Sequence, residues 1–240
     1  MVSSTERSSG SVGRSSRFDS SVIGRDARHL PAAGPRICPG GVPARRTGYA
    51  SIVTRAEDQE LIEALKRGAS VLKAADIPFA LAGGFAVYAH GGASSDHDVD
   101  FLIKPQDAER ALAAMLDAGL KVERPPEDWL VKAYHDGTLI DLIFRPVERT
   151  VTDAVLADSE FMKVEAIGMQ VLSATELMVH KLLTFGQHYC DFSRGLPLAR
   201  SLREKIDWSR VRRETAASPY AMAFLYLGEQ LDIIPGEETA

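Results

Sequence analysis

The sequence has few cysteines and no long apolar run, and each scarcity excludes a class of protein. Only Cys38 and Cys190 occur among its 240 residues, too few for a disulfide framework or a cysteine-built zinc site. The longest apolar run near either end, residues 221–227, is far shorter than the roughly 20 residues needed to cross a bilayer. The sequence therefore predicts a cytoplasmic protein that is neither secreted nor embedded in a membrane.

Residues 1–50 differ from the rest of the chain in charge and in patterning. They hold eight arginines, three acidic residues and nine serines, so this segment carries a net charge of +5 and the remainder −10. It shows no hydrophobic period of a helix or strand, so it lacks the apolar surface to offset the cost of ordering its backbone. We expect a disordered, basic, Ser/Arg/Gly-rich tail over residues 1–54. An organelle transit peptide, a nucleic-acid-binding arm and upstream sequence from a misplaced start codon are explanations that the composition leaves open.

The remainder has the composition of an ordinary globular protein, and its hydrophobic period changes along the chain. Helices are expected from residue 56, over residues 85–90 and from Pro105. Strands are expected at residues 79–82, 98–103, 129–134 and 138–144, the last two joined by an Asp-Gly hairpin turn. Beyond Pro146 the pattern is mostly helical, with a capping box at residues 173–176 and a helix opened by Ser218-Pro219. We therefore predict an α/β core at residues 55–148 and a mainly helical domain at residues 149–240.

The strand at residues 98–103 carries the first sign of chemistry. Side chains alternate along a strand, so Asp98 and Asp100 project from one face while Val99 and Phe101 pack on the other. Two carboxylates about 5 Å apart repel each other by on the order of 3 kcal/mol at an effective dielectric near 20. A divalent cation removes this repulsion, and oxygen ligands without cysteine favour Mg²⁺ or Mn²⁺. A solvated acidic edge strand is the alternative interpretation.

Two further features favour the metal site. Gly83-Gly84 lies between a buried strand and a helix, where the absent β-carbons let a phosphate approach backbone N–H groups. Asp141 is the single charge in an apolar strand, which is costly unless a cation or hydrogen-bond donors satisfy it. Phosphate beside a carboxylate metal site is typical of nucleotide chemistry.

These residues resemble the nucleotidyltransferase superfamily that includes DNA polymerase β. Its signature is Gly-Gly or Gly-Ser after a hydrophobic residue, then an acid-x-acid motif about ten to thirteen residues later and a third acid on a later strand. Residues 81–91 followed by Asp98-Val99-Asp100 are most similar to the toxin-type branch, the AbiE and MenT enzymes. The resemblance implies a nucleotidyltransferase core, a mixed sheet with flanking helices, followed by a helical C-terminal half. The family's Arg-x-Thr before the acids is here Ser94-Ser95-Asp96.

The resemblance also assigns two residues of the helical half, Lys181 and Asp191, to nucleotide binding. Lys181 has independent support, because a helical projection places it between Leu177 and Phe185 on the apolar face, away from the polar side with His180. A lysine there extends its amine to solvent or meets an anion such as a triphosphate.

The resemblance implies transfer of a nucleotidyl group from an NTP to a hydroxyl, with release of pyrophosphate. Asp98 and Asp100 would hold Mg²⁺, Asp141 would complete one metal site and help deprotonate the acceptor, and Gly83, Gly84 and Lys181 would position the phosphates. A toxin-type enzyme that modifies tRNA and has a cognate antitoxin is one form of this hypothesis. Seven basic residues between Arg194 and Glu214 are compatible with an RNA contact or with ordinary salt bridges. A small-molecule, antibiotic-type enzyme and a degenerate, non-catalytic nucleotide- or antitoxin-binding module are the alternatives.

Overall fold

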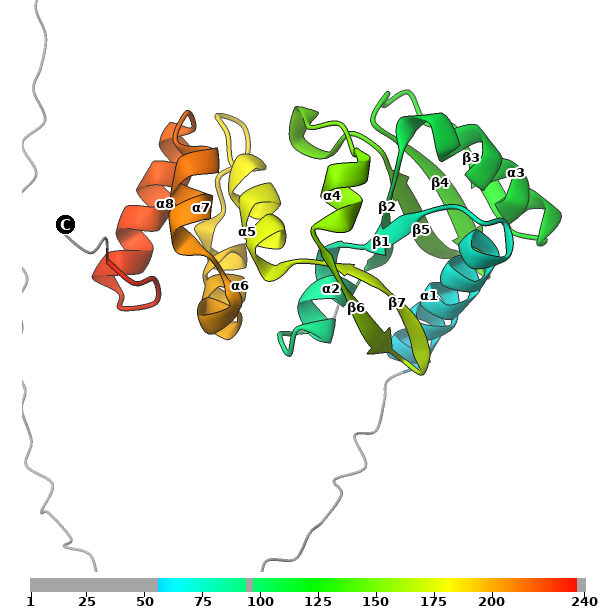
Figure 1. Cartoon of the computed structure of the whole chain (residues 1–240), viewed down its shortest axis with the longest axis horizontal. Helices are drawn as coiled ribbons and strands as arrows, with labels where there is room; N and C mark the ends of the chain where they lie inside the picture. Colours follow the sequence, from blue (N-terminus) through cyan, green and yellow to red (C-terminus); the bar gives the residue numbers. More distant parts are fainter. Residues whose placement is uncertain (1–55, 94–96, 237–240) are drawn as a thin grey trace, which may run out of the picture. The chain divides into compact units, whose positions relative to one another are not determined.

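A mixed sheet flanked by helices forms the first part of the structure, and a group of helices follows it (Figure 1). The computed structural model describes residues 56–93 and 97–236. Within these residues the predicted fold class, a mixed sheet with flanking helices and a helical C-terminal region, is confirmed. The tail predicted at residues 1–54 lies outside the described residues.

The sheet has seven strands within the described ranges, in the order β3-β4-β5-β2-β1-β7-β6. The strands are β1 (Phe79–Leu81), β2 (Asp98–Ile103), β3 (Lys121–Glu123), β4 (Leu130–His135), β5 (Thr138–Ile143), β6 (Ser159–Val164) and β7 (Ile167–Leu172). Two neighbouring pairs, β2 with β5 and β1 with β7, are parallel, and the other pairs are antiparallel. The strand that carries the Asp-x-Asp motif therefore lies inside the sheet, with a neighbour on each side.

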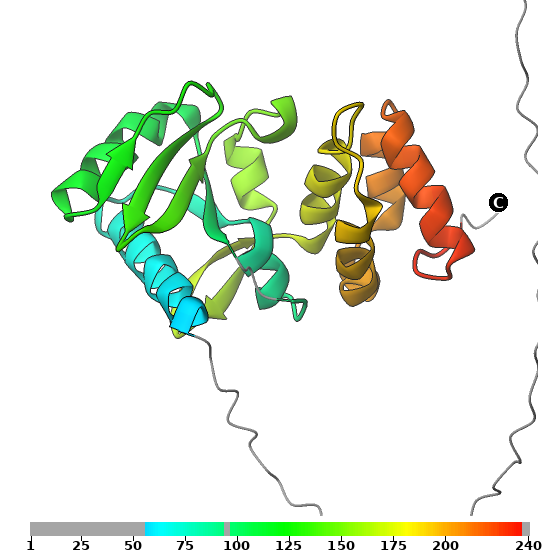
Figure 2. The same cartoon turned by 180° about the vertical axis from the view of Figure 1, so that it is seen from behind.

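The longer helices are α1 (Ala56–Ala74), α2 (Gly83–Ala89), α3 (Ala108–Asp117), α4 (Asp153–Ala157), α5 (Ala174–Leu183), α6 (Leu196–Ser201), α7 (Trp208–Thr215) and α8 (Pro219–Gln230). Short 3₁₀ turns are η1 (Pro105–Asp107), η2 (Pro146–Glu148), η3 (Phe192–Arg194) and η4 (Arg203–Lys205). Helices α1 and α3 lie side by side on one face of the sheet in both views (Figures 1 and 2). Helix α2 packs against β2 and β7 and also contacts α5, so it links the sheet to the C-terminal helices.

Local sequence signals explain most element ends. The side chain of Ser173 accepts a hydrogen bond from the Glu176 backbone N–H, as the capping box predicts, and Ser218 caps α8 in the same way. Asp136 and Gly137 both have positive φ angles, of 49° and 94°, which matches the twist of the hairpin between β4 and β5.

The hairpin of β6 and β7 is a feature that sequence analysis did not predict, and it adds two strands to the sheet after residue 148. Its two-residue turn places Glu165 and Ala166 at φ angles of 46° and 72°. This conformation is usually supplied by Asn or Gly, so the sequence lacks the ordinary hairpin signal there. The division of the chain into domains at residue 148 stays a prediction.

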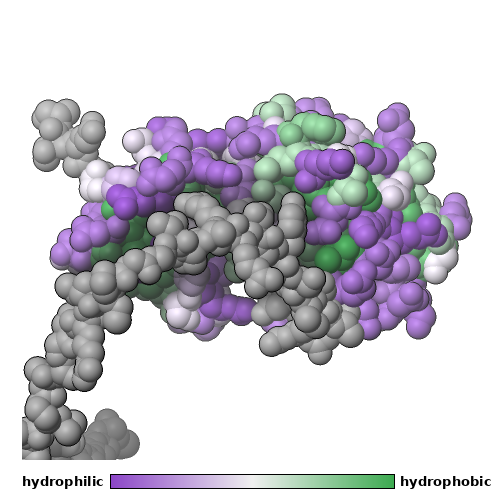
Figure 3. Space-filling view, turned by 90° about the horizontal axis from the view of Figure 1, so that it is seen from below, coloured by the Kyte–Doolittle hydropathy of each residue, from purple (hydrophilic) through white to green (hydrophobic). Residues whose placement is uncertain are grey.

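The surface is mostly hydrophilic on the face shown in Figure 3, with smaller hydrophobic areas between polar ones. Within the described part of the chain, large exposed apolar side chains are scattered over several elements: Tyr88, Leu116, Phe161, Tyr189, Met222, Tyr226 and Leu231. No helix among the described residues has the length and apolar character that crossing a membrane requires.

Candidate active site

Three carboxylates meet where β2 and β5 run side by side. In their parallel register Asp100 lies opposite Asp141, and the strand alternation puts Asp98 on the same face as Asp100. Val99 and Phe101 point the other way and are fully buried, and Phe101 lies close to Gly68 of α1. One oxygen from each of the three aspartates lies within 4.8 Å of the others. The structure thus brings together all three predicted metal ligands.

Burial and mutual repulsion make this cluster costly in the ionised state. Burial, with the nearby charges of Asp98 and Asp141, raises the pKa of Asp100 to about 7. Burial also raises the pKa of Asp141 to about 6; Lys132 opposes the shift and Asp98 adds to it. The Oδ1 atom of Asp141 is buried and has no hydrogen-bond partner among the described residues. Oxygen ligands, close spacing and an unpartnered buried oxygen all fit a divalent cation.

The close approach of the Asp100 carboxylate requires glycine at position 83. Its φ angle is +55°, and a β-carbon built on it would lie 1.7 Å from Oδ2 of Asp100. Any other residue would therefore be strained and would push this carboxylate away. Glycine at this position therefore does more than leave space for a phosphate, because it also leaves space for a ligand of the predicted metal site.

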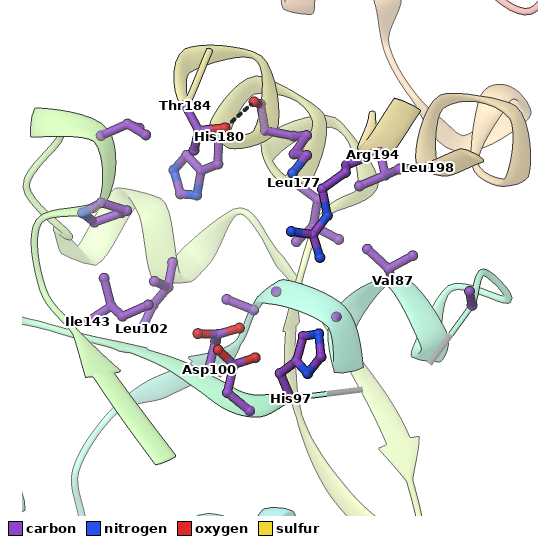
Figure 4. Close-up of a pocket in the computed structure, with 18 of the residues that line it drawn as sticks. Val87, His97, Asp100, Leu102, Ile143, Leu177, His180, Thr184, Arg194 and Leu198 are labelled. Atoms are coloured by element: carbon purple, nitrogen blue, oxygen red, sulfur yellow. Dashed lines mark hydrogen bonds between the residues drawn. The ribbon is translucent and has the colours of Figure 1, made fainter. Parts of the chain in front are cut away.

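A cavity of about 990 Å³ opens above the carboxylates (Figure 4). Its floor includes Gly83, Gly84, Asp98 and Asp100, and its opposite wall is formed by side chains of α5, η3 and α6. The loop around η2 and Trp129 also line the cavity. A cavity of this volume is large enough for a nucleotide and part of an acceptor.

Lys181 lies on the cavity wall that faces the carboxylates. Its Nζ is 5.8 Å from the centre of the Phe185 ring, and the described residues provide no ion-pair partner for it. Burial and the neighbouring Arg194 lower the pKa of Lys181, while Asp191 acts in the opposite sense. A half-buried amine that forms no ion pair is suited to an anion in the cavity.

The sequence model of a family described as "Uncharacterised nucleotidyltransferase" matches residues 23–230. The chain belongs to this nucleotidyltransferase family. No curated protein sequence matches it.

The chain is similar to several solved structures. A crystal structure of ANT(2")-Ia in complex with adenylyl-2"-tobramycin is 12% identical with a TM-score of 0.50, covering 68% of this chain and 98% of that one. A solution structure described as the antibiotic-resistance factor ANT(2'')-Ia is 13% identical with a TM-score of 0.52, covering 72% and 99%. The lincosamide antibiotic adenylyltransferase LnuA, bound to lincomycin, is 14% identical with a TM-score of 0.40, covering 59% and 93%. At these identities the first two show a shared fold.

In this nucleotidyltransferase, Asp191 does not line the cavity. It caps η3 instead, because its Oδ1 accepts hydrogen bonds from the backbone N–H and the hydroxyl of Ser193, at 3.1 and 2.5 Å. The hydrogen bonds from Ser193 and the charges of Arg194 and Lys181 hold the pKa of Asp191 below its ordinary value. Its assignment to nucleotide binding stays a prediction.

Arg194 and His180, on the wall opposite the carboxylates, were not predicted as site residues, and neither were His97 and Arg145, which line other parts of the cavity. Arg194 points into the cavity above the start of α2 (Figure 4), and sequence analysis had counted it only as part of a basic segment. His180 also lines the cavity, together with Thr184. The helical projection placed His180 on the polar side of its helix, and the structure turns that side toward the cavity as well. A helical projection gives the angle between side chains but not which side faces a neighbouring part of the fold.

His180 belongs to a buried ion-pair network centred on Glu176, whose side chain is 2% exposed. The Oε1 atom of Glu176 lies 3.3 Å from His180 Nε2 and 3.1 Å from Arg149 Nη1, and its Oε2 lies 2.7 Å from Arg210 Nη2. Burial would raise the pKa of Glu176, but His180 and the two arginines hold it below its ordinary value. The network ties α5 to α7 and to the residue that follows η2.

The basic segment at residues 194–214 is used mainly inside the fold. Arg210 also binds Asp158 and Glu214, each at 2.5 Å, and Arg212 binds Glu229 and a backbone carbonyl. Two more of its cations donate to backbone carbonyls: Arg203 to Asp232 and Lys205 to His90. Four of the seven basic residues therefore stabilise the C-terminal helices rather than form an open cationic surface.

Proposed function

We propose that the protein transfers a nucleotidyl group from an NTP to a hydroxyl group of a small molecule and releases pyrophosphate. The observation that carries this proposal is the cavity, with Asp98 and Asp100 of the carboxylate cluster on its floor and two cations that form no ion pair with any described residue, Lys181 and Arg194, on the opposite wall. The family shows the reaction class; the acceptor and the cation are our proposal.

The carboxylates Asp98, Asp100 and Asp141 would hold one or two divalent cations, Mg²⁺ or Mn²⁺. When bound, such a cation polarises the phosphoryl group and neutralises developing negative charge. Gly83 leaves room for the carboxylate of Asp100, and Lys181 provides a positive charge for the phosphates. Asp141, with a pKa near 6, is ionised at neutral pH and is the residue we assign to accept the acceptor's proton.

In the transfer step the acceptor oxygen forms a bond to the α-phosphorus while the bond from that phosphorus to the bridging oxygen of the β-phosphate breaks. The electron pair of the broken bond leaves with pyrophosphate. Because no covalent enzyme intermediate is needed, the protein contributes by orienting the two substrates and by electrostatic stabilisation.

Two considerations favour a small acceptor over tRNA. Most of the basic residues that could have contacted an RNA backbone are engaged in ion pairs or hydrogen bonds inside the fold. The structural neighbour ANT(2")-Ia is described with an adenylylated antibiotic, which is a small hydroxyl compound. A toxin-type activity on tRNA with a cognate antitoxin, and a non-catalytic module, remain hypotheses that the same experiment tests.

The experiment incubates the protein with each NTP labelled at the α-phosphate, with Mg²⁺, and with either a panel of small hydroxyl compounds or total RNA. Label on a small compound supports the proposal, and label on RNA supports the toxin-type hypothesis instead. Label on neither favours the non-catalytic module. The Asp100→Asn variant, checked by its melting temperature, serves as the matched inactive control.

A further inference from the structure

Two neighbouring cations lie on the cavity wall, and the carboxylate whose charge acts on both, that of Asp191, lies outside the cavity lining and is hydrogen-bonded to Ser193. In the part of the chain that the structure describes, neither the amine of Lys181 nor the guanidinium of Arg194 makes an ion pair or a side-chain hydrogen bond. They are close enough that the charge of Arg194 disfavours the protonated form of Lys181. Two like charges held together beside a cavity are stabilised when an anion binds between them.

The backbone that carries Arg194 is fixed from both sides. On its N-terminal side, Asp191 caps η3 through the two hydrogen bonds to Ser193. Phe192 packs edge-on against Phe185 and Phe224, with ring centres 5.2 and 5.4 Å apart.

On the C-terminal side, Gly195 lies so close to the same aromatic cluster that a β-carbon on it would be 2.7 Å from the Phe224 ring. The turn therefore fixes the backbone at Arg194, and the long arginine side chain extends from it into the cavity (Figure 4).

We propose that Arg194 is a second phosphate-binding cation, which acts with Lys181 on the β- and γ-phosphates of the NTP. We assign Asp191 a positioning role, because it holds the turn that presents Arg194. This inference rests on the proposed function and deepens it. When the bond between the α-phosphorus and the bridging oxygen breaks, the electron pair remains on pyrophosphate, and the two cations neutralise that charge. A guanidinium is well suited to the task because it donates two parallel hydrogen bonds to phosphate oxygens.

Binding of inorganic tripolyphosphate tests the role of Arg194 without requiring an acceptor. Titration calorimetry of the full chain with tripolyphosphate and Mg²⁺ should show Arg194→Met binding about ten- to a hundredfold more weakly than the wild type. Arg200→Met is the matched control, because Arg200 is an exposed arginine of the same segment that does not line the cavity. It should change affinity less than twofold.

Equal losses in the two variants would indicate general charge attraction and would overturn the proposal. So would unchanged binding by Arg194→Met, or a wild type that does not bind tripolyphosphate. Melting temperatures within a few degrees of the wild type exclude loss of folding as the cause.

Two variants of Asp191 separate positioning from direct binding. Serine can cap the turn without a carboxylate, whereas alanine cannot. If Asp191 acts through Arg194, Asp191→Ser should keep tripolyphosphate affinity within about threefold or increase it, and Asp191→Ala should lose affinity. In the Arg194→Met background, Asp191→Ala should then reduce tripolyphosphate affinity little further. Equal loss in Asp191→Ser and Asp191→Ala would assign Asp191 a direct role and overturn the positioning role.

The two proposals fail in different ways. A protein that binds tripolyphosphate through Arg194 but transfers label to no acceptor would overturn the proposed function and leave this inference standing. A protein that transfers label normally after Arg194→Met would overturn this inference and leave the proposed function standing.

Discussion

Replacing Gly83 by alanine tests the most restrictive contact in the site. The added β-carbon would lie 1.7 Å from Oδ2 of Asp100, whereas real contacts of this kind stay beyond about 3.0 Å. The carboxylate must therefore retreat by roughly 1.3 Å or the backbone must move. A retreat of the carboxylate disturbs its spacing with Asp98 and Asp141, since one oxygen of each of the three now lies within 4.8 Å of the others.

Two effects of different size follow from this substitution. Alanine in the left-handed region costs roughly 1–2 kcal/mol, so the free energy of unfolding should fall by at least that amount. Misplacing a reacting group by about 1 Å can cost on the order of a hundredfold in rate. We therefore expect Gly83→Ala to remain folded at room temperature and to lose about a hundredfold in kcat/KM and much of its affinity for Mg²⁺.

The assays are denaturant unfolding, Mg²⁺ titration and nucleotidyl transfer on one preparation. Gly119→Ala is the matched control, because Gly119 has a φ angle of +87° and a β-carbon there meets nothing within 4 Å. It should lose stability without losing transfer. Combining Gly83→Ala with Asp100→Ala removes the clash, so Asp100→Ala should cost less stability in that background than in the wild type. Full transfer activity in Gly83→Ala, or additive stability effects in the double variant, would refute the reasoning.

Three further predictions concern protonation, phosphate binding and backbone strain. A carboxyl whose pKa is raised from 3.8 to about 7 favours the folded state most when it is neutral. Without metal, the free energy of unfolding contributed by Asp100 should therefore fall by on the order of 4 kcal/mol as pH rises from about 4 to 7. Denaturant unfolding in the presence of a chelator measures this dependence on pH, which should be weaker in Asp100→Asn. Adding Mg²⁺ should restore the stability of the wild type at high pH. Lys181→Met should lower kcat/KM for the NTP about ten- to a hundredfold with equal or higher melting temperature, and an unchanged kcat/KM would return this residue to a packing role. Val147 lines the cavity with φ and ψ both at 45°, a strained conformation for a β-branched residue. Val147→Gly should keep or raise the melting temperature but reduce transfer several-fold. The control Ala166→Gly, at a φ angle of 72° in the β6–β7 turn, should leave transfer unchanged. Equal activity in these two glycine variants would show that the strain at Val147 has no role in the site.

The sequence by itself determined the features that depend on neighbours along the chain. Strand alternation is a property of the backbone, so Asp98 and Asp100 had to share a face once residues 98–103 formed a strand. The Asp-Gly hairpin and the serine caps are equally local, because each joins groups only a few residues apart. These signals predicted the core of the sheet and the paired carboxylates.

Tertiary structure decided everything that depends on which elements meet. Asp141 was recognised as a costly buried charge, but only the register of β5 against β2 places it opposite Asp100. The β6–β7 hairpin escaped prediction because its turn uses residues that seldom adopt positive φ angles.

The partners of the basic residues at 194–214 were also decided by tertiary structure. Its composition was equally compatible with an RNA-binding surface, and only the packing of α5, α7 and α8 shows that Arg210 and Arg212 are paired internally while Arg194 points into the cavity. A charge has no fixed partner in a sequence, because ion pairs form between residues that folding brings within a few ångströms regardless of their separation along the chain.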